Sequence, residues 1–531
     1  MTVLPAYERL REGANTRLES SAGKIRVAVR AGHCSIALGA EDVLRAFEED
    51  LLDNARLVAT GCDGACYAGP QVIITAPDGE TVLLPRVDVD TAIRVSTIIE
   101  GGGTPLRYAD DVSDFIEGQV RVVLNGCGDI DAEGIDEYLQ SGGYRGLAAA
   151  LSDSPEATIA TVKESGLRGR GGAYYPAALK WEAARAAAEG SRYLVVNSEE
   201  GEPGLFKDRH LMEGVPHRIV EGALIAAYAT QASVIYLYIN AEADLSARRI
   251  ERALADAEAL RLIGDDVLGS GWSVRATIRR GAGGYVCGEE TTLLNTMEGR
   301  RREPRLRPPF PTEAGLNARP TVINNAETLS NLPFILTEGP AAFSALGAEN
   351  ASGTKVLSLS GAVARPGLVE TPFGTPLSTV VEGIGGGMRD ESVLTALGVG
   401  GPSSGLLSPV SLDIKIMPGM LHESGVILGA GGLVAIDESV GILDAMRALA
   451  AYNADESCGK CTPCREGTPR IVEVIDRLAR RGASREDVEE LTYLAEVVGS
   501  ASLCGLGQAA GGPVTSTLHF FGRELGIPQE K

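Results

Sequence analysis

A run of cysteines near the carboxyl end constrains this chain more than any other feature of its sequence. Cys458, Cys461 and Cys464 follow a C-x2-C-x2-C spacing within ESCGKCTPCREG, and Cys504 lies downstream in SASLCGLG. Zinc sites usually use separated cysteine pairs, whereas three thiols on one tight turn with a remote fourth suit an iron–sulfur cube. The spacing therefore predicts a [4Fe–4S] cluster, with a zinc clip or unligated thiols as the alternatives.

Length, charge and cysteine usage bound the class of protein. A chain of 531 residues exceeds one ordinary core, so roughly two to four domains are expected. A net charge of −22 argues against nucleic acid binding, which needs clustered basic side chains. The sequence shows neither an apolar run of about 18 residues nor a secretion signal. Nine unevenly placed cysteines favour a reduced compartment, so we expect a cytoplasmic protein that does not insert into a membrane.

The pattern of strands and helices divides the chain into four blocks. Residues 1–105 read as a small α/β domain with strands at KIRVAVRAG and ARLVAT, a helix at AEDVLRAFEEDL, a hairpin around Asp78 and Gly79, and a closing helix at VDTAIRVSTII. In residues 106–340, strands such as RYLVVN and ASVIYLYIN alternate with helical patterns, which is typical of a parallel α/β sheet. Residues 341–435 are β-rich, and residues 436–531 are helical.

Two motifs of the second block combine glycines with charged side chains. GLRGRGGAYYPAALKW contains Gly169, Gly171 and Gly172, which allow close backbone approach to a phosphate or ring, and Arg170 and Lys180, which supply charge. A structural loop is the alternative. VVNSEEGEPGLFKDR follows a strand, at the strand end where α/β sheets bind ligands. We expect its polar residues to bind hydroxyl groups of a ligand, and a solvated acidic turn is the alternative. These residues are Asn197, Glu199, Glu200 and Glu202.

A third glycine-rich motif and the segments that follow it supply further candidate ligand-binding residues. RRGAGGYVCGEETTLLNTMEG has a loose turn at residues 281–284, after which Glu289 and Glu290 open a helix. PRLRPPFP supplies Arg307 and Phe310 for phosphate contact or stacking, although such a phenylalanine is more often part of a core. PTVINNAETL then offers amide groups at residues 324 and 325.

The order and wording of these motifs over residues 106–531 resemble the NADH-binding flavoprotein subunit of respiratory complex I. They are equally similar to the diaphorase subunits of NAD-linked formate dehydrogenases and cytoplasmic hydrogenases. The resemblance implies a Rossmann-like domain for FMN and NADH, a β-grasp domain of the soluble ligand-binding type, and a helical bundle whose [4Fe–4S] ligands match Cys458, Cys461, Cys464 and Cys504. Positions that match the flavin cradle are Gly169, Arg170, Gly171, Gly172, Lys180, Asn197, Gly288, Glu289, Asn324 and Asn325. Positions that match those near NADH are Glu202, Tyr285, Glu290, Arg307 and Phe310.

The resemblance implies a diaphorase subunit that exchanges hydride between NAD(H) and FMN. Ring stacking supplies proximity, and no general acid or base is required. Single electrons then pass through the [4Fe–4S] cluster to or from partner subunits. These would be a thioredoxin-like [2Fe–2S] subunit and an iron–sulfur catalytic or electron-transfer subunit. The alternatives are a non-catalytic electron-transfer or docking subunit with a decayed flavin site, and a zinc-stabilised adapter.

Three departures from the family pattern bear on the nicotinamide site. The family usually reads Gly-Phe-Pro-Thr-Gly where this chain has YYPAA, so Tyr174 replaces a glycine. If that glycine has a positive φ, a tyrosine there costs roughly 1 kcal/mol or more, and its ring could also crowd the dinucleotide. Glu199 also replaces a customary Asp, and Arg307 a customary Lys.

The N-terminal block resembles a thioredoxin-like [2Fe–2S] domain whose ligands follow C-x4-C and C-x3-C. Cys62 and Cys66 match the second pair and Cys34 the second member of the first, but the remaining position falls on Val29. His33 is the nearest substitute, and we expect it to point to the opposite strand face if the strand extends that far. The sequence therefore predicts a folded domain that docks against a partner and holds no complete [2Fe–2S] cluster.

Overall fold

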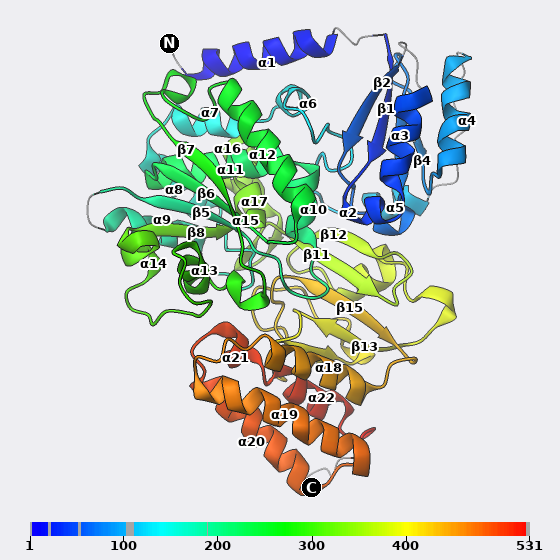
Figure 1. The fold of residues 1–531 in the computed structure, drawn as a ribbon, viewed down its shortest axis with the longest axis vertical. Helices are drawn as coiled ribbons and strands as arrows, with labels where there is room; N and C mark the ends of the chain where they lie inside the picture. Colours follow the sequence, from blue (N-terminus) through cyan, green and yellow to red (C-terminus); the bar gives the residue numbers. More distant parts are fainter. Residues whose placement is uncertain (1–2, 20–22, 51–54, 102–110, 188–189, 527–531) are drawn as a thin grey trace.

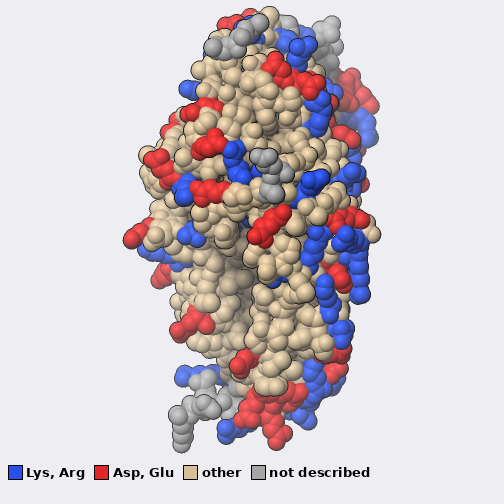
Figure 2. All heavy atoms as spheres, turned by 90° about the vertical axis from the view of Figure 1, so that its left-hand side faces the viewer, with Lys and Arg blue, Asp and Glu red and all other residues tan. Residues whose placement is uncertain are grey.

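The computed structural model is a mixed α/β protein with several separate sheets, as the sequence predicts (Figure 1). It describes residues 3–19, 23–50, 55–101, 111–187 and 190–526. The domain boundary expected near residue 105 lies outside these described residues. Among them, no helix is long and apolar enough to cross a membrane. Acidic and basic side chains are interspersed over the face seen in Figure 2.

The N-terminal sheet and its helices are β1 (Ile25–Arg30), α2 (His33–Ala37), α3 (Ala40–Asp50), β2 (Ala55–Thr60), the 3-10 turn η1 (Cys66–Ala68), β3 (Gln71–Thr75), β4 (Thr81–Leu84) and α4 (Val89–Glu100). The strand order is β2-β1-β3-β4, with β1 parallel to β2 and the other pairs antiparallel. Phe47 of α3 and Val95 of α4 pack against Val27 and Ile74 of the sheet. The strands, the hairpin and the two longer helices lie where the sequence predicts them.

The first helix of the chain packs away from that sheet. Helix α1 (Val3–Glu19) lies against α6 (Asp136–Gln140) and α7 (Arg145–Leu151) of the central region. Tyr7 and Ala14 are buried in this contact, and Arg17 pairs with Asp136 at 2.6 Å. The chain therefore crosses the central region before it enters the N-terminal sheet (Figure 1).

The central sheet consists of β5 (Tyr193–Ser198), β6 (Val234–Ile239), β7 (Arg275–Arg280) and β8 (Thr321–Asn325). Its order is β7-β6-β5-β8 and all its pairs are parallel, which confirms the predicted parallel α/β pattern. Helix α11 (Pro216–Thr230) covers one face. On the other face, Leu293 and Leu294 of α13 (Glu290–Met297) meet Val195. The register places Asn197 beside Asn325 where β5 and β8 end.

Other helices surround the central sheet and complete its core. They are α8 (Pro155–Glu164), α9 (Ala177–Ala186), α10 (Lys207–Gly214), α12 (Asp244–Ala259), η2 (Val267–Gly269), η3 (Tyr285–Gly288), α14 (Pro311–Ala314), η4 (Leu316–Ala318), α15 (Ala326–Ser330), α16 (Leu332–Glu338) and α17 (Pro340–Ala345). As the sequence predicts, α13 opens at residues 289 and 290, because the Glu289 carboxylate caps it by accepting from the backbone N–H groups of Thr291 and Thr292.

The third region is β-rich, as predicted. Its elements are α5 (Asp111–Glu117), β9 (Gly347–Ala348), β10 (Ala351–Ser352), β11 (Thr354–Gly361), β12 (Gly367–Pro372), the π-helical turn η5 (Thr379–Ile384), η6 (Arg389–Glu391), β13 (Leu394–Val399), β14 (Gly405–Leu407), η7 (Pro409–Ser411) and β15 (Gly432–Asp437). The sheet order is β12-β11-β15-β13-β14, with β11 and β15 parallel. Ala65 and Ala68 of the N-terminal region share its apolar core with Phe115 of α5.

The C-terminal region is helical, as predicted. It comprises α18 (Ile442–Asp455), α19 (Thr462–Arg481), α20 (Arg485–Ala501), α21 (Gly505–Ala509) and α22 (Gly512–Phe521). Ile471 and Val474 of α19 pack against Leu491 and Val498 of α20. The loop before α19 carries the cysteine run and lies close to η3 of the central region, where Tyr285 packs in the same cluster as Cys461 and Cys464.

Candidate functional site

The site is built around the carboxyl ends of β5 and β8. Asn325 donates from Nδ2 to the backbone oxygen of Asn197 at 3.1 Å, and Asn197 donates from Nδ2 to the Gly288 oxygen at 2.9 Å. Asn324 accepts from Trp181 Nε1 at 2.9 Å. These bonds hold two strand ends, helix α9 and the turn before α13 in one place, where three sequence motifs meet.

The glycine loop of residues 169–172 lies against this strand edge. A Cβ atom on Gly171 would lie 3.1 Å from the Cβ of Asn325, which is tighter than ordinary contact. Gly172 has a φ of +112°, where an L side chain is strained. The loop therefore needs glycine for its own backbone, and it presents peptide groups rather than side chains next to Asn325.

Arg170, between these glycines, serves the fold. Its guanidinium donates to the backbone oxygens of Thr354 at 2.9 Å, Ser352 at 2.9 Å and Arg168 at 2.8 Å. It also lies 4.8 Å from the ring centre of Phe373 and is fully buried. The expectation that this side chain supplies charge to a ligand is therefore wrong, because its charge anchors the glycine loop to β10 and β11.

Lys180 was also expected to supply charge to a ligand, and its ammonium group does lie at the strand edge. Lys180 Nζ donates to the backbone oxygen of Ile323 and to Glu290 Oε2, both at 3.0 Å. Arg307 Nη1 contacts the other oxygen of Glu290 at 3.1 Å. Glu290 is thus held between two cations, and Phe310, beyond Arg307, exposes half of its surface.

The acidic motif splits into two kinds of carboxylate. Glu200 accepts from the backbone N–H groups of Asp208 and Arg209 and so caps α10. Burial raises the pKa of Glu199 to about 7 and that of Glu202 to about 8. In each of these two residues, one buried carboxyl oxygen has no hydrogen-bond partner among the described residues. Such orphaned acceptors fit the hydroxyl groups of a ligand.

Sequence reasoning missed a buried ion network beneath the strand edge. Lys207 Nζ contacts Asp208 Oδ1 at 2.7 Å and Glu327 Oε2 at 3.1 Å, and Lys355 Nζ contacts the same oxygen of Glu327 at 2.6 Å. Asp208 in turn accepts from Asn325 Nδ2 at 2.7 Å. All four charged side chains are buried. Lys207 and Asp208 lie inside the quoted acidic motif, but no periodicity marks a buried lysine.

The tyrosine pair that departs from the family pattern is placed unambiguously. Tyr174 has a φ of 53°, as expected for a residue that replaces a glycine of positive φ. Its ring is buried and lies 6.1 Å from that of Phe373, and its hydroxyl donates to the Gly429 oxygen at 2.8 Å. The ring therefore turns into the core of the third region, and Tyr175 is the exposed member of the pair.

The four cysteines of the C-terminal motif gather beside η3. Cys461 precedes α19, Cys464 lies in its first turn, and Cys504 precedes α21. Cys464 and Cys504 are buried together, with Cys461 and Tyr285 packed against them. Cys458 lies close enough for its charge to raise the pKa of Cys504, alongside the larger effect of burial.

Tyr285 connects the strand-edge site to these cysteines. Its backbone N–H donates to Glu456 Oε2 at 2.9 Å, and its ring lies 6.0 Å from that of Tyr452. The Tyr452 hydroxyl donates to the Gly201 oxygen at 2.8 Å, within the acidic motif. Tyr452 and Tyr285 therefore lie between the acidic loop and the thiols.

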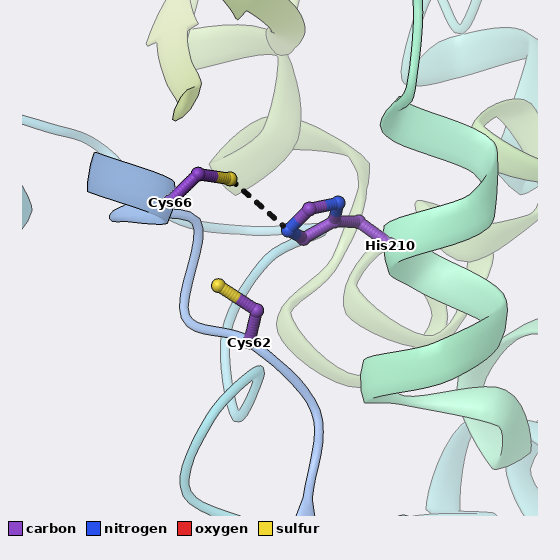
Figure 3. Close-up of side chains that lie close together, drawn as sticks. All are labelled: Cys62, Cys66 and His210. Atoms are coloured by element: carbon purple, nitrogen blue, oxygen red, sulfur yellow. Dashed lines mark hydrogen bonds between the residues drawn. The ribbon is translucent and has the colours of Figure 1, made fainter. Parts of the chain in front are cut away.

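A second thiol group lies at the interface between the N-terminal sheet and α10. Cys62 Sγ, Cys66 Sγ and a ring nitrogen of His210 all lie within 4.8 Å of one another (Figure 3). Among the described residues no other three such donor atoms converge this closely, so the four C-terminal thiols are spread more widely than one zinc ion would hold them. His210 comes from a different region of the chain, and sequence spacing offered no signal for it.

The neighbours of this second group correct the expectation for His33. Strand β1 ends at Arg30, so His33 opens α2 and does not continue the strand. Glu213 of α10 accepts from its backbone N–H at 2.8 Å and contacts Nδ1 at 2.9 Å. Val29 is buried in the strand interior. His33 is thus bound to a carboxylate.

Family comparisons identify the chain. The Nuo51 FMN-binding domain matches residues 162–333, the NADH-ubiquinone oxidoreductase-F iron-sulfur binding region matches residues 444–526, and the SLBB domain matches residues 356–407. The chain is 41% identical over 406 residues to HndC, a subunit of the NADP-reducing hydrogenase of Solidesulfovibrio fructosivorans, covering 76% of this chain and 83% of that one. The chain belongs to the family of NADH-binding flavoprotein subunits of complex I and NAD-linked hydrogenases.

Further matches extend the likeness of this flavoprotein. It is 40% identical over 390 residues to a subunit of the NADH-quinone oxidoreductase of Streptomyces coelicolor, covering 73% of this chain and 87% of that one. It is similar to a chain of the NAD+-reducing [NiFe]-hydrogenase in the H2-reduced state, with a TM-score of 0.68 and 30% identity over 96% of this chain and 85% of the other. It is therefore an NADH/FMN diaphorase subunit with a [4Fe–4S] cluster in a larger complex. The prediction of a [4Fe–4S] cluster is confirmed, and the matched iron-sulfur binding region includes the cysteine run.

Proposed function

We propose that this flavoprotein performs its NADH–FMN exchange at the shared edge of β5 and β8 and delivers electrons past Tyr285 to the C-terminal cysteines. The observation that carries this proposal is the position of Tyr285, which packs on the thiols while its partner Tyr452 bonds the acidic loop. When bound, FMN accepts two electrons as hydride and releases them singly. The thiols that would hold the cluster are Cys458, Cys461, Cys464 and Cys504.

The residues at the strand edge fit a flavin. The glycine loop offers backbone peptide groups, Lys180 offers a cation, and the asparagines offer amide groups already oriented by their neighbours. Arg170 contributes by holding that loop, because its guanidinium is bonded to backbone oxygens and is not free to touch a ligand. We assign FMN binding to Gly169, Gly171, Gly172, Lys180, Asn197, Gly288, Glu289, Asn324 and Asn325, with Arg170 acting through the loop.

The dinucleotide would lie on the more exposed side of the same edge. Glu199 and Glu202 have buried oxygens without partners among the described residues, which suit ribose hydroxyl groups. Glu290 is set to accept from a ribose, and Arg307 and the half-exposed Phe310 suit a phosphate and a ring. We assign NADH contacts to Glu199, Glu202, Tyr285, Glu290, Arg307 and Phe310. Glu200 contributes through α10, which it caps.

We also propose that the chain consists of four domains. The mixed sheet of residues 23–101 supports a thioredoxin-like domain within residues 1–105, and the parallel sheet supports a Rossmann-like domain within residues 106–340. The match to the SLBB domain supports a β-grasp domain within residues 341–435, and the packed helices support a bundle within residues 436–531.

The parent assembly is best sought among NAD-linked oxidoreductases of the cytoplasm, such as hydrogenases and formate dehydrogenases. The structural match to the NAD+-reducing hydrogenase chain covers 96% of this protein, and by sequence the hydrogenase relative HndC is matched over 76% of it. Likeness to the hydrogenase chain thus extends over nearly the whole protein. We expect a thioredoxin-like [2Fe–2S] subunit and another iron–sulfur subunit as partners.

Flavin content tests the proposal directly. The full chain, purified anaerobically and denatured, should release one FMN, and the native chain should reduce an artificial acceptor with NADH. Gly171→Val should lose FMN, because its side chain would collide with Asn325, yet it should keep the iron of the cluster. Gly383→Ala is the matched control, because a Cβ atom there meets nothing within 4 Å. Iron-containing protein without FMN would instead support the docking-subunit alternative with a decayed flavin site.

A further inference from the structure

The interface between the N-terminal sheet and α10 holds a convergent set of metal-ligand side chains. Cys62 and Cys66 come from the loop after β2, and His210 comes from the middle of α10. Figure 3 shows the Cys66 thiol directed toward the imidazole, with Sγ at 3.7 Å from His210 Nε2, and the Cys62 thiol beside them. These three donor atoms come from regions separated by more than 140 residues of chain, so local sequence does not account for their meeting.

A fourth donor lies beside this group. Cys34, in α2, lies close enough to Cys66 to interact with its thiol, although it is not one of the three donors that lie within 4.8 Å of one another. It is partly exposed, whereas Cys62 is buried. Two sulfurs and one nitrogen thus converge at one point in the interface, and the Cys34 sulfur is the nearest candidate for a fourth ligand.

We propose that Cys62, Cys66 and His210 bind one zinc ion, that Cys34 moves in to complete the site as the fourth ligand, and that the ion fastens the N-terminal sheet to helix α10. Three thiolates and one imidazole form one of the common ligand sets of structural zinc. With Zn–S near 2.3 Å and Zn–N near 2.0 Å, tetrahedral geometry places sulfur and nitrogen about 3.6 Å apart. The distance of 3.7 Å between Cys66 Sγ and His210 Nε2 agrees with that edge.

The same geometry disfavours a two-iron cluster. Two irons divide their four protein ligands into two pairs on opposite sides of the bridging sulfides. Donors on different irons therefore lie farther apart than donors on one ion. Here three donors from two segments all lie within 4.8 Å of one another, which fits a single centre.

The surroundings hold the ligands in place before any ion arrives. The backbone N–H of Gly64 donates to Cys62 Sγ at 3.4 Å, which favours a thiolate. Asp63, between them, is fixed by Arg30 at 2.5 Å and by Gln71 at 3.1 Å. A Cβ atom on Gly61 would fall on the backbone of Gly214, so the ligand loop lies directly against the end of α10.

The imidazole of His210 has little else to orient it. Its Nδ1 is buried and has no hydrogen-bond partner among the described residues. The ring of His33 meets it edge-on at 5.2 Å, and that of Phe206 lies 5.9 Å away. The thiols are therefore the polar groups toward which the ring points. A disulfide between any two of them would leave a third thiol and this imidazole buried together without an ion.

Metal analysis of the full chain tests the proposal. Protein expressed with both zinc and iron supplied should contain one zinc per chain in addition to the four irons of the C-terminal cluster. His210→Ala and Cys62→Ala should each lose the zinc and keep the four irons. Cys127→Ala is the matched control and should keep both metals. Its thiol is buried at the same interface, 3.0 Å from a Cβ atom built on Gly214, but does not belong to the converging group.

Cobalt gives a second readout that does not depend on the variants folding. Chain loaded with Co2+ in place of zinc should show the visible absorption of tetrahedral cobalt and the near-ultraviolet bands of thiolate ligation. Six irons per chain with a reducible [2Fe–2S] signal would overturn the proposal in favour of a two-iron cluster. Absence of a second metal would overturn it as well, and a disulfide mapped among Cys34, Cys62 and Cys66 would explain that result.

Discussion

Replacing Tyr174 by glycine, the residue that the family usually has at this position, should destabilise this chain. Tyr174 has a φ of 53°, a backbone conformation that glycine adopts with less strain than tyrosine. Its ring, however, is buried against Phe373, and its hydroxyl donates to the Gly429 oxygen at 2.8 Å. The buried ring and the hydrogen bond of Tyr174 therefore stabilise the fold by more than its backbone strain destabilises it.

The magnitudes decide the sign of the effect. Relief of the backbone strain would stabilise the variant by roughly 1 kcal/mol. Removal of a buried aromatic ring costs about 3 kcal/mol or more, since the cavity is only partly filled by relaxation. Loss of the hydroxyl leaves a buried carbonyl oxygen without its donor, which costs about 1 kcal/mol. The net result is a loss of about 3 kcal/mol in the region that contains Gly429.

Hydrogen exchange followed by mass spectrometry measures that loss region by region. This suits a multidomain chain, for which a single free energy of unfolding is poorly defined. Peptides from β11 and β15 should exchange on the order of 100-fold faster in Tyr174→Gly, as about 3 kcal/mol implies. Tyr174→Phe should lose about 1 kcal/mol. Tyr175→Gly, which removes an exposed ring, should leave those peptides nearly unchanged. Equal or stronger protection in Tyr174→Gly would refute the reasoning.

Three other predictions concern charge, pH and the cluster. NADH should be preferred to NADPH because the Glu290 carboxylate accepts from ribose hydroxyl groups and repels a 2′-phosphate, a repulsion that its neighbours Lys180 and Arg307 reduce but do not cancel. Glu290→Gln should narrow the ratio of the two kcat/KM values about fivefold, an effect of about 1 kcal/mol, and equal values in the unmutated protein would contradict this. Burial raises the pKa of Glu202 to about 8, so the folded chain keeps a proton that the unfolded chain releases above about pH 4.5. Stability should therefore fall as the pH rises from about 5 to 8, and Glu202→Gln should flatten this fall in thermal unfolding of the nucleotide-free chain; an unchanged slope would rule out this origin. Cys504→Ala should abolish the paramagnetic signal of the reduced [4Fe–4S] cluster and keep FMN, whereas Cys287→Ala should keep both.

Local pattern was sufficient to predict most elements of this fold. The strands β1, β2, β5 and β6 lie where alternating or continuous apolar runs predict them, and the Asp-Gly turn marks the β3–β4 hairpin. The start of α13 was predictable because Glu289 lies where a side chain can cap the first turn. The [4Fe–4S] cluster was also predictable from local sequence, because three cysteines share one short segment.

What the sequence did not reveal depends on long-range contacts. Arg170 looks like a phosphate ligand within its motif, but its guanidinium meets the oxygens of Thr354 and Ser352, which are more than 180 residues away. Glu327 similarly forms salt bridges with Lys207 and Lys355, which come from two other parts of the chain. A charge in a sequence gives no sign of whether it will meet solvent, a ligand or a buried partner.

Helix α10 connects the strand edge of β5 and β8, where we propose that FMN binds, to the N-terminal region through successive side chains. Its first turn is capped by Glu200 of the acidic motif, and Asp208 holds Asn325 at the end of β8. Farther along the helix, His210 faces the thiols of the N-terminal loop. At the other end, the Glu213 carboxylate accepts a hydrogen bond from the backbone N–H of His33. A short helix with both ends bonded in this way has little freedom to tilt. Loosening the N-terminal contact would therefore disturb the asparagine beside the glycine loop, even though no N-terminal residue belongs to the proposed flavin site.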